Sequence, residues 1–157
     1  MIGNDFRKVL LIGIGNEYRS DDGIGLLIAK EIRKKQIPSV TVKEESGEGA
    51  ALMEAWQGFQ NVFIVDAVSS GAMPGTVFRI DANKETVPKK FFHYSTHAFS
   101  VSETIELARA MNVLPPKVVI YGIEGNNFAA GTTISLLIQQ TAHKIIDQIV
   151  TDMQSFR

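Results

Sequence analysis

Three residues far apart in the sequence, Asp22, Asp66 and His97, carry side chains that could together bind a metal ion. Asp22 follows an apolar segment and a glycine-rich turn, Asp66 ends a second apolar run, and His97 lies in a polar segment before a helical pattern. Two carboxylate oxygens and one imidazole nitrogen form a partial shell for a borderline divalent cation, with positions left open for another ligand. The three residues are therefore the candidates for a metal site.

Each candidate also has a structural alternative. Aspartate is a preferred helix N-cap, so Asp22 or Asp21 could cap the helix that follows. Asp66 could form a turn at the end of its strand, and His97 could be a solvated or structurally bonded loop residue. His93 lies four residues before His97, but the intervening residues do not favour the helix that a paired-histidine metal motif would need.

Alternating strand and helix patterns position these residues. Continuous apolar runs at 8–12 and 62–66 indicate strands buried on both faces. The full set of expected strands is 8–12, 40–44, 62–66, 75–81 and 117–123, and that of expected helices is 22–35, 48–57, 101–111 and about 132–153. This order predicts a single α/β domain over residues 1–157.

The expected architecture is a three-layer α/β/α sandwich around a mostly parallel, mixed sheet of about five strands, with segment 75–81 near an edge. Open α/β sheets bind ligands beyond the carboxyl ends of their strands. Residues that leave neighbouring parallel strands meet at that edge. We therefore expect Asp22 and Asp66 to lie within reach of one ligand.

Composition excludes several classes of function. The 157 residues carry a formal net charge of −1, which gives no electrostatic reason to expect nucleic acid or an anionic membrane as a partner. The absence of cysteine excludes disulfides, a thiolate nucleophile and cysteine-rich metal sites. No apolar run approaches the roughly 20 residues of a spanning helix, and the N-terminus lacks a signal peptide's apolar core. We expect a cytoplasmic protein without membrane insertion.

The glycine-rich turn, GIGN at 13–16, raises the alternative of a dinucleotide site. A Rossmann fingerprint needs a third glycine three residues after the second, and Tyr18 occupies that position. Asp21 and Asp22 in the same loop would also repel a pyrophosphate. The pattern therefore disfavours nucleotide binding.

The combination of motifs resembles one family. GIGN at 13–16, DDGIG at 21–25, VDA at 65–67 and STH at 95–97 are similar, in order and spacing, to segments of the hydrogenase maturation endopeptidases. These enzymes trim the C-terminal extension from the large-subunit precursor of [NiFe]-hydrogenases. The resemblance implies that Asp22, Asp66 and His97 contact the metal and are the catalytic residues. It also implies a mixed sheet between helix layers.

The resemblance further implies that nickel comes from the precursor's own active site, so that the protease tests whether maturation is complete; other divalent cations can substitute. A metal-polarised carbonyl or metal-bound water can be attacked without a protein nucleophile. Asp21 is expected to hold a ligand in position by a hydrogen bond. Whether nickel serves catalysis or only recognition stays open at this stage.

One segment departs from the family pattern. Members commonly carry an aspartate and a Gly-Thr-x-Gly turn after the second strand, whereas this chain has EESGEGA at 44–50. Glu45 and Glu48 are candidates for lining the cleft, with a solvated turn and a helix cap as the alternative. Two other functions remain open. One is a non-proteolytic nickel-binding protein or metallochaperone on the same fold, and the other is a small-molecule hydrolase or nucleotide binder.

Overall fold

A computed structural model describes residues 8–92 and 100–156 of the chain. In this part, one sheet has the strand order β2-β1-β3-β5-β4. Its strands are β1 (Val9–Ile14), β2 (Val40–Glu45), β3 (Asn61–Val68), β4 (Val77–Asp81) and β5 (Lys117–Glu124). All pairings are parallel except that of β4, which runs antiparallel to β5 at one edge. The mixed, mostly parallel sheet and the edge position of β4 are confirmed.

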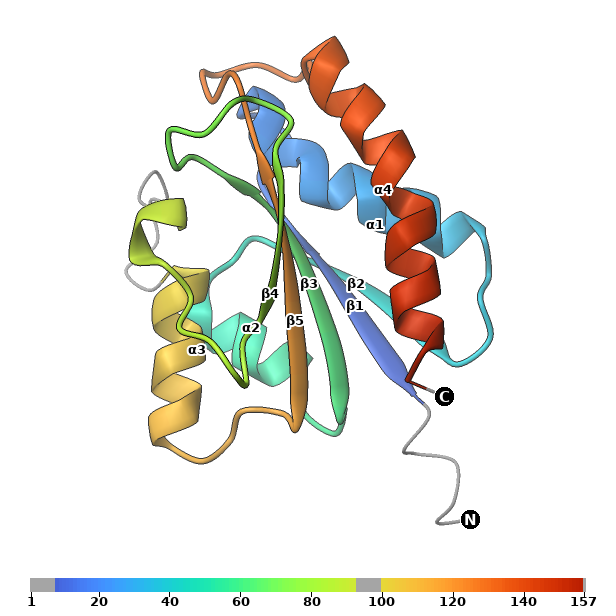
Figure 1. Cartoon of the computed structure of the whole chain (residues 1–157), viewed down its shortest axis with the longest axis vertical. Helices are drawn as coiled ribbons and strands as arrows, with labels where there is room; N and C mark the ends of the chain where they lie inside the picture. Colours follow the sequence, from blue (N-terminus) through green and yellow to red (C-terminus); the bar gives the residue numbers. More distant parts are fainter. Residues whose placement is uncertain (1–7, 93–99, 157) are drawn as a thin grey trace.

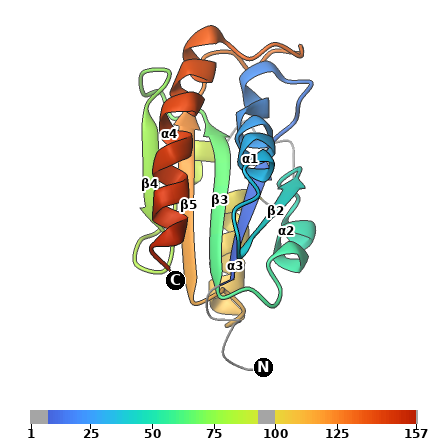
Figure 2. The same ribbon diagram turned by 90° about the vertical axis from the view of Figure 1, so that its right-hand side faces the viewer.

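Helices cover both faces of this sheet, which confirms the three-layer arrangement (Figures 1 and 2). On one face lie α1 (Ile24–Lys34) and α4 (Leu136–Gln154), and on the other lie α2 (Gly49–Ala55) and α3 (Val101–Ala110). The described part of the chain also contains the short 3-10 turns η2 (Ser20–Gly23) and η3 (Lys89–Phe92). Across residues 8–92 and 100–156, every helix is too short or too polar to cross a membrane.

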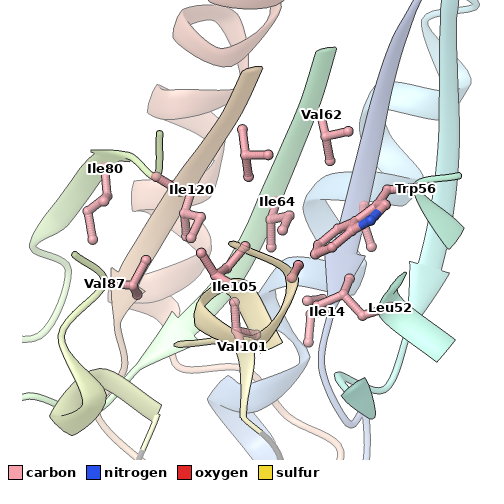
Figure 3. Close-up of a cluster of buried hydrophobic side chains, with 14 of the residues drawn as sticks. Ile14, Leu52, Trp56, Val62, Ile64, Ile80, Val87, Val101, Ile105 and Ile120 are labelled. Carbon is pink, nitrogen blue, oxygen red and sulfur yellow. The ribbon is translucent and has the colours of Figure 1, made fainter. Parts of the chain in front are cut away.

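The apolar core is divided between the two faces because successive strand residues point in opposite directions. In β3, Val62 and Ile64 pack toward α2 and α3, while Phe63 and Val65 pack toward α1 and α4. Figure 3 shows the first cluster, in which Trp56 and Leu52 lie on the side of α2. Both faces of β3 are thus covered, as its continuous apolar run predicts.

Two helix starts differ from expectation. Gly23, not an aspartate, is the N-cap of α1, and it makes no side-chain capping bond. Asp21 and Asp22 lie one turn earlier, in η2, where their carboxylates bond other parts of the chain. The last helix begins at Leu136 rather than near residue 132, because residues up to Ser135 belong to a loop bound by Asp21.

Candidate functional site

A cavity of about 310 Å³ lies at the carboxyl end of the sheet, and both predicted aspartates line it. Asp22 reaches it from η2 and Asp66 from β3. The register supports this, since Gly13 near the end of β1 pairs with Val65, the residue before Asp66. In Figure 1 this end of the sheet is at the top, where the loops after β1, β3 and β5 gather. The expected convergence of the two carboxylates is found.

Strand alternation explains the direction of the Asp66 side chain. Ile64 and Val68, two residues to either side, belong to the core cluster under α2 and α3. Asp66 therefore faces the same layer, at the end of that cluster. Phe92 of η3 and Val101 at the start of α3 line the cavity beside it. Phe92 and Val101 thus form an apolar side of the cavity, and Asp66 occupies a strand position that otherwise faces the hydrophobic core.

The environment of Asp66 strongly disfavours its charged form. The side chain is 4 % exposed, and within the described ranges its Oδ1 has no hydrogen-bond partner. Burial, and next the nearby charge of Asp22, raise the pKa of Asp66 well above its ordinary value, while a hydrogen bond from the Ala67 backbone acts in the opposite direction. A buried carboxylate oxygen without a donor is costly, and a cation placed there would compensate it.

Close backbone packing holds Asp22 over the sheet. A Cβ atom on Gly15 would lie 2.1 Å from the carbonyl oxygen of Asp22, and one on Gly25 would lie 2.3 Å from the carbonyl oxygen of Ile14. The backbone N–H of Asn16 also donates to Asp22 Oδ2 over 3.1 Å. The glycines of the first turn therefore bring η2 and α1 against the strands, which accounts for the motif without a nucleotide.

The contact at Gly25 gives a stability prediction. In Gly25→Ala the new methyl group meets the backbone oxygens of Ile14 and Val65 at 2.3 and 2.4 Å, so α1 must move away from the sheet. Overpacking of this kind costs about 1–3 kcal/mol or more. Urea denaturation measures it. In the control Gly23→Ala, the nearest atoms lie at 3.5 Å or beyond, and we expect no loss; equal destabilisation of both variants would contradict the packing role of Gly25.

Asp21 is bound to the chain itself. Its side chain is fully buried, and it accepts hydrogen bonds from Asn126 N, Asn127 N, Ser135 N and Ser135 Oγ at 2.7–2.8 Å. Ser20 adds a bond from its Oγ to Ala129 O over 2.8 Å. These contacts fix the loop after β5 to η2. Asp21 thus positions Asp22 through the backbone of η2. The hydrogen bonds that the structure shows at the Asp21 carboxylate all come from this loop.

The third predicted ligand, His97, lies outside the described residues, as does His93. Among residues 8–92 and 100–156, no group of three acidic, histidine or cysteine side chains is placed to hold a metal ion. Asp22 and Asp66 therefore supply two of the donors that a metal site would need. The role of His97 as the third donor stays a prediction.

The turn that departs from the family pattern contributes Ser46 and Gly47 to the cavity lining. Glu48 is the N-cap of α2, and its carboxylate accepts bonds from Ala50 N and Ala51 N at 3.1 and 2.9 Å. The helix-cap alternative for Glu48 is thus confirmed.

Sequence reasoning missed several residues that line the cavity, among them Arg19, Leu26, Phe92 and Val101. The position of Arg19 between the end of β1 and Asp22 is a signal that could have identified it. Phe92 and Val101 carry no such signal, because only the packing of η3 and α3 brings them to the cavity.

Comparison with known proteins finds similarity along nearly the whole chain. The family model of the HycI hydrogenase maturation proteases matches residues 9–152, nearly the whole chain. A protein of Methanocaldococcus jannaschii, named as a hydrogenase maturation protease, is 23% identical over 147 residues, which cover 92% of each chain.

Solved structures share the fold. The crystal structure of the [NiFe] hydrogenase maturation protease HycI from Thermococcus kodakarensis has a TM-score of 0.72 at 21% identity, covering 95% of this chain and 93% of that one. The hydrogenase maturating endopeptidase HybD from Escherichia coli has a TM-score of 0.73 at 17% identity, covering 94% and 93%. The likeness covers nearly all of this chain and of each of the two solved chains.

Proposed function

Since the chain belongs to the hydrogenase maturation protease family, we propose that it removes the C-terminal extension of a [NiFe]-hydrogenase large-subunit precursor after nickel insertion. Family membership makes the chain a hydrolase of the endopeptidase class. The finer proposal concerns nickel. The chain recognises the precursor's nickel through Asp22, Asp66 and His97, and the metal belongs to the substrate rather than to the protease.

One observation carries the nickel proposal: Asp66 Oδ1 is buried in the cavity with no hydrogen-bond partner among residues 8–92 and 100–156, close to a second carboxylate, that of Asp22. A divalent cation would offset both the burial and the charge of Asp22, which together disfavour the ionised form of Asp66. Oxygen donors together with one imidazole suit a borderline cation such as nickel. The donor set therefore fits the metal.

The chain's own residues have separate parts in this proposal. Asp66 would bind the cation in its ionised form, its proton passing to solvent, because the charge of the cation would offset the burial and the Asp22 charge that raise its pKa. Asp22 is kept in orientation by Asn16 N and by the close contact at Gly15. The apolar wall formed by Phe92 and Val101 limits water around the scissile bond. A divalent cation supplies Lewis acidity, so hydrolysis requires no protein nucleophile.

Cleavage of a purified precursor tests the proposal. Wild-type protein should release the extension from nickel-loaded precursor and leave nickel-free precursor intact. Asp22→Asn keeps the shape and an oxygen but loses the charge, and we expect a fall of about 100-fold in kcat/KM. The measurement is the ratio of processed to unprocessed large subunit by mass spectrometry.

The outcomes separate the alternatives. Nickel binding without cleavage by the wild type would favour the metallochaperone function. Equal cleavage of nickel-loaded and nickel-free precursors would remove the nickel requirement, and unimpaired cleavage by Asp22→Asn would remove the role of Asp22. Asp147→Asn, a change of the same type on the exposed side of α4, is the matched control and should cleave normally.

A further inference from the structure

A second hollow, a groove of about 470 Å³, lies along the outer side of α1. Glu17 and Leu26 line both hollows, so the groove adjoins the cavity that Asp22 and Asp66 line. Its other lining residues follow α1 from its beginning to Lys34 in its last turn. The groove could therefore hold part of a peptide that is cleaved beside Asp22 and Asp66.

The wall opposite α1 is already fixed. Thr132 and Ile134 form it, and both lie in the loop that Asp21 binds through Asn126, Asn127 and Ser135. A wall held by buried hydrogen bonds needs little ordering when a ligand arrives, and preformed sites bind with a smaller entropic cost.

The part of the groove nearest the site is mainly apolar and also carries the carboxylate of Glu17. Leu26, Leu27 and Ile134 line it, and all three keep part of their side chains accessible. The buried stripe of α1 is formed by other residues, Ile24, Ile28 and Ile32. Leu27 packs in part against the core cluster, and its remaining accessible surface, together with that of Leu26, is available to an apolar ligand side chain.

The far end of the groove is basic. Lys30, Arg33 and Lys34 line it, with side chains 48–71 % exposed. Lys30 and Arg33 share the single carboxylate of Glu44, and Lys34 pairs with Glu31. Three cations therefore face two anions in these pairs, and the surplus positive charge favours an acidic group there.

The length of the groove matches a short extended peptide. The eleven residues of α1 span roughly 16 Å at 1.5 Å per residue. An extended chain advances about 3.3 Å per residue, so about five residues fit along the helix.

We propose that this groove binds the first residues of the precursor's C-terminal extension, downstream of the scissile bond, in an extended conformation. This inference rests on the proposed function. The polarity selects the downstream side: the apolar end adjoins the cleavage site, and the basic end lies where the chain runs on toward its free carboxylate. The upstream side of the scissile bond leads instead to the precursor's nickel site.

Peptide binding tests the groove independently of cleavage. The probe is a fluorescein-labelled synthetic peptide of the ten residues after the scissile bond, titrated with the full chain and followed by anisotropy. Leu27→Ser should weaken binding about ten-fold, as expected for the loss of one buried apolar side chain. Lys34→Glu, which changes an exposed side chain and carries little folding risk, should also weaken it, and less so at high salt.

The matched control is Met111→Ser, which removes an exposed apolar side chain at the C-cap of α3, the helix on the face of the sheet opposite α1 (Figure 1). It should bind the peptide like the wild type. Absence of peptide binding by the wild type, or equal binding by the wild type, Leu27→Ser and Lys34→Glu, would overturn the proposal.

Cleavage kinetics connect the groove to the reaction. For wild-type protein, replacing the first five extension residues by alternating glycine and serine should raise KM about ten-fold and leave kcat unchanged. Leu27→Ser should show the same rise on the native precursor and no further rise on the glycine–serine precursor. If the wild type cleaves neither precursor, the proposed function is contradicted. The peptide titration then still tests whether the groove binds the extension.

Discussion

Replacing Asp66 by asparagine will lower kcat/KM for nickel-loaded precursor by roughly 1,000-fold, which corresponds to about 4 kcal/mol of lost stabilisation of the transition state. The same change will raise the free energy of unfolding at pH 8. The physical reason is the burial of Asp66 in an apolar wall, where Oδ1 has no donor within the described ranges. A neutral amide of similar shape avoids the cost of the charge there. Loss of activity together with a gain in stability is typical of a residue kept for function.

The pH dependence follows from the direction of the pKa shift. Asp66 binds its proton more tightly in the folded chain than in the unfolded chain, since burial and Asp22 raise its pKa above 3.8. Folding is therefore penalised as pH rises above that value, and the penalty levels off once pH exceeds the folded-state pKa. The stability difference between Asp66→Asn and the wild type should thus grow from acidic to alkaline pH.

Urea denaturation between pH 4 and pH 8 measures this difference, with the metal removed by a chelator. Asp147→Asn, on the exposed side of α4, is the control and should follow the wild type at each pH. A stability difference that stays constant across this range, or one that favours the wild type at pH 8, would contradict an uncompensated charge at Asp66.

Asp21→Ala will be the most destabilising of the substitutions considered. It leaves three backbone N–H groups and one hydroxyl, all now bonded to a fully buried carboxylate, without an acceptor. At about 1 kcal/mol or more for each orphaned donor, the loss is about 4 kcal/mol. That is a large fraction of the 5–15 kcal/mol typical of a folded domain. Thermal and urea unfolding measure it.

Two milder variants separate hydrogen bonding from packing. In Asp21→Asn the amide oxygen can take the place of Oδ2, which accepts three of the bonds, and the bond from Ser135 N is lost. This variant should therefore lose less free energy of unfolding than Asp21→Ala. Ser135→Ala removes only the bond from Ser135 Oγ and should cost about 1 kcal/mol. Equal losses for all three variants would mean that the bonds do not set the stability of this loop.

Most of the fold followed from local patterns. Continuous apolar runs identified β1 and β3, and the edge position expected for segment 75–81 is that of β4, whose antiparallel direction was not predicted. The boundary errors occurred where tertiary contacts override local preference. Asp21 and Asp22 resemble helix caps because aspartate favours that position, yet distant backbone groups use both carboxylates. No local rule predicts a bond between residues 21 and 135.

The candidate site was predictable in part because local patterns identified the strands that position it. Asp22 and Asp66 follow strands, so the sheet brings them together whatever the detailed packing. The burial of Asp66 was not predictable, because it depends on Phe92 and Val101 from segments without a chemical signal. The glycine pattern suggested a ligand loop, whereas at Gly15 and Gly25 it serves backbone contact between η2, α1 and the strands.

The Asp21 contacts also have a consequence for exchange with solvent. The amide hydrogens of Asn126, Asn127 and Ser135 lie in a loop, where exchange is usually fast, but each donates to the same buried carboxylate. These hydrogens should exchange only when η2 separates from the loop, and we expect this local opening to be rare. We therefore expect η2 and the loop after β5 to keep their conformation on binding, so that a binding partner has to adjust its own conformation to them.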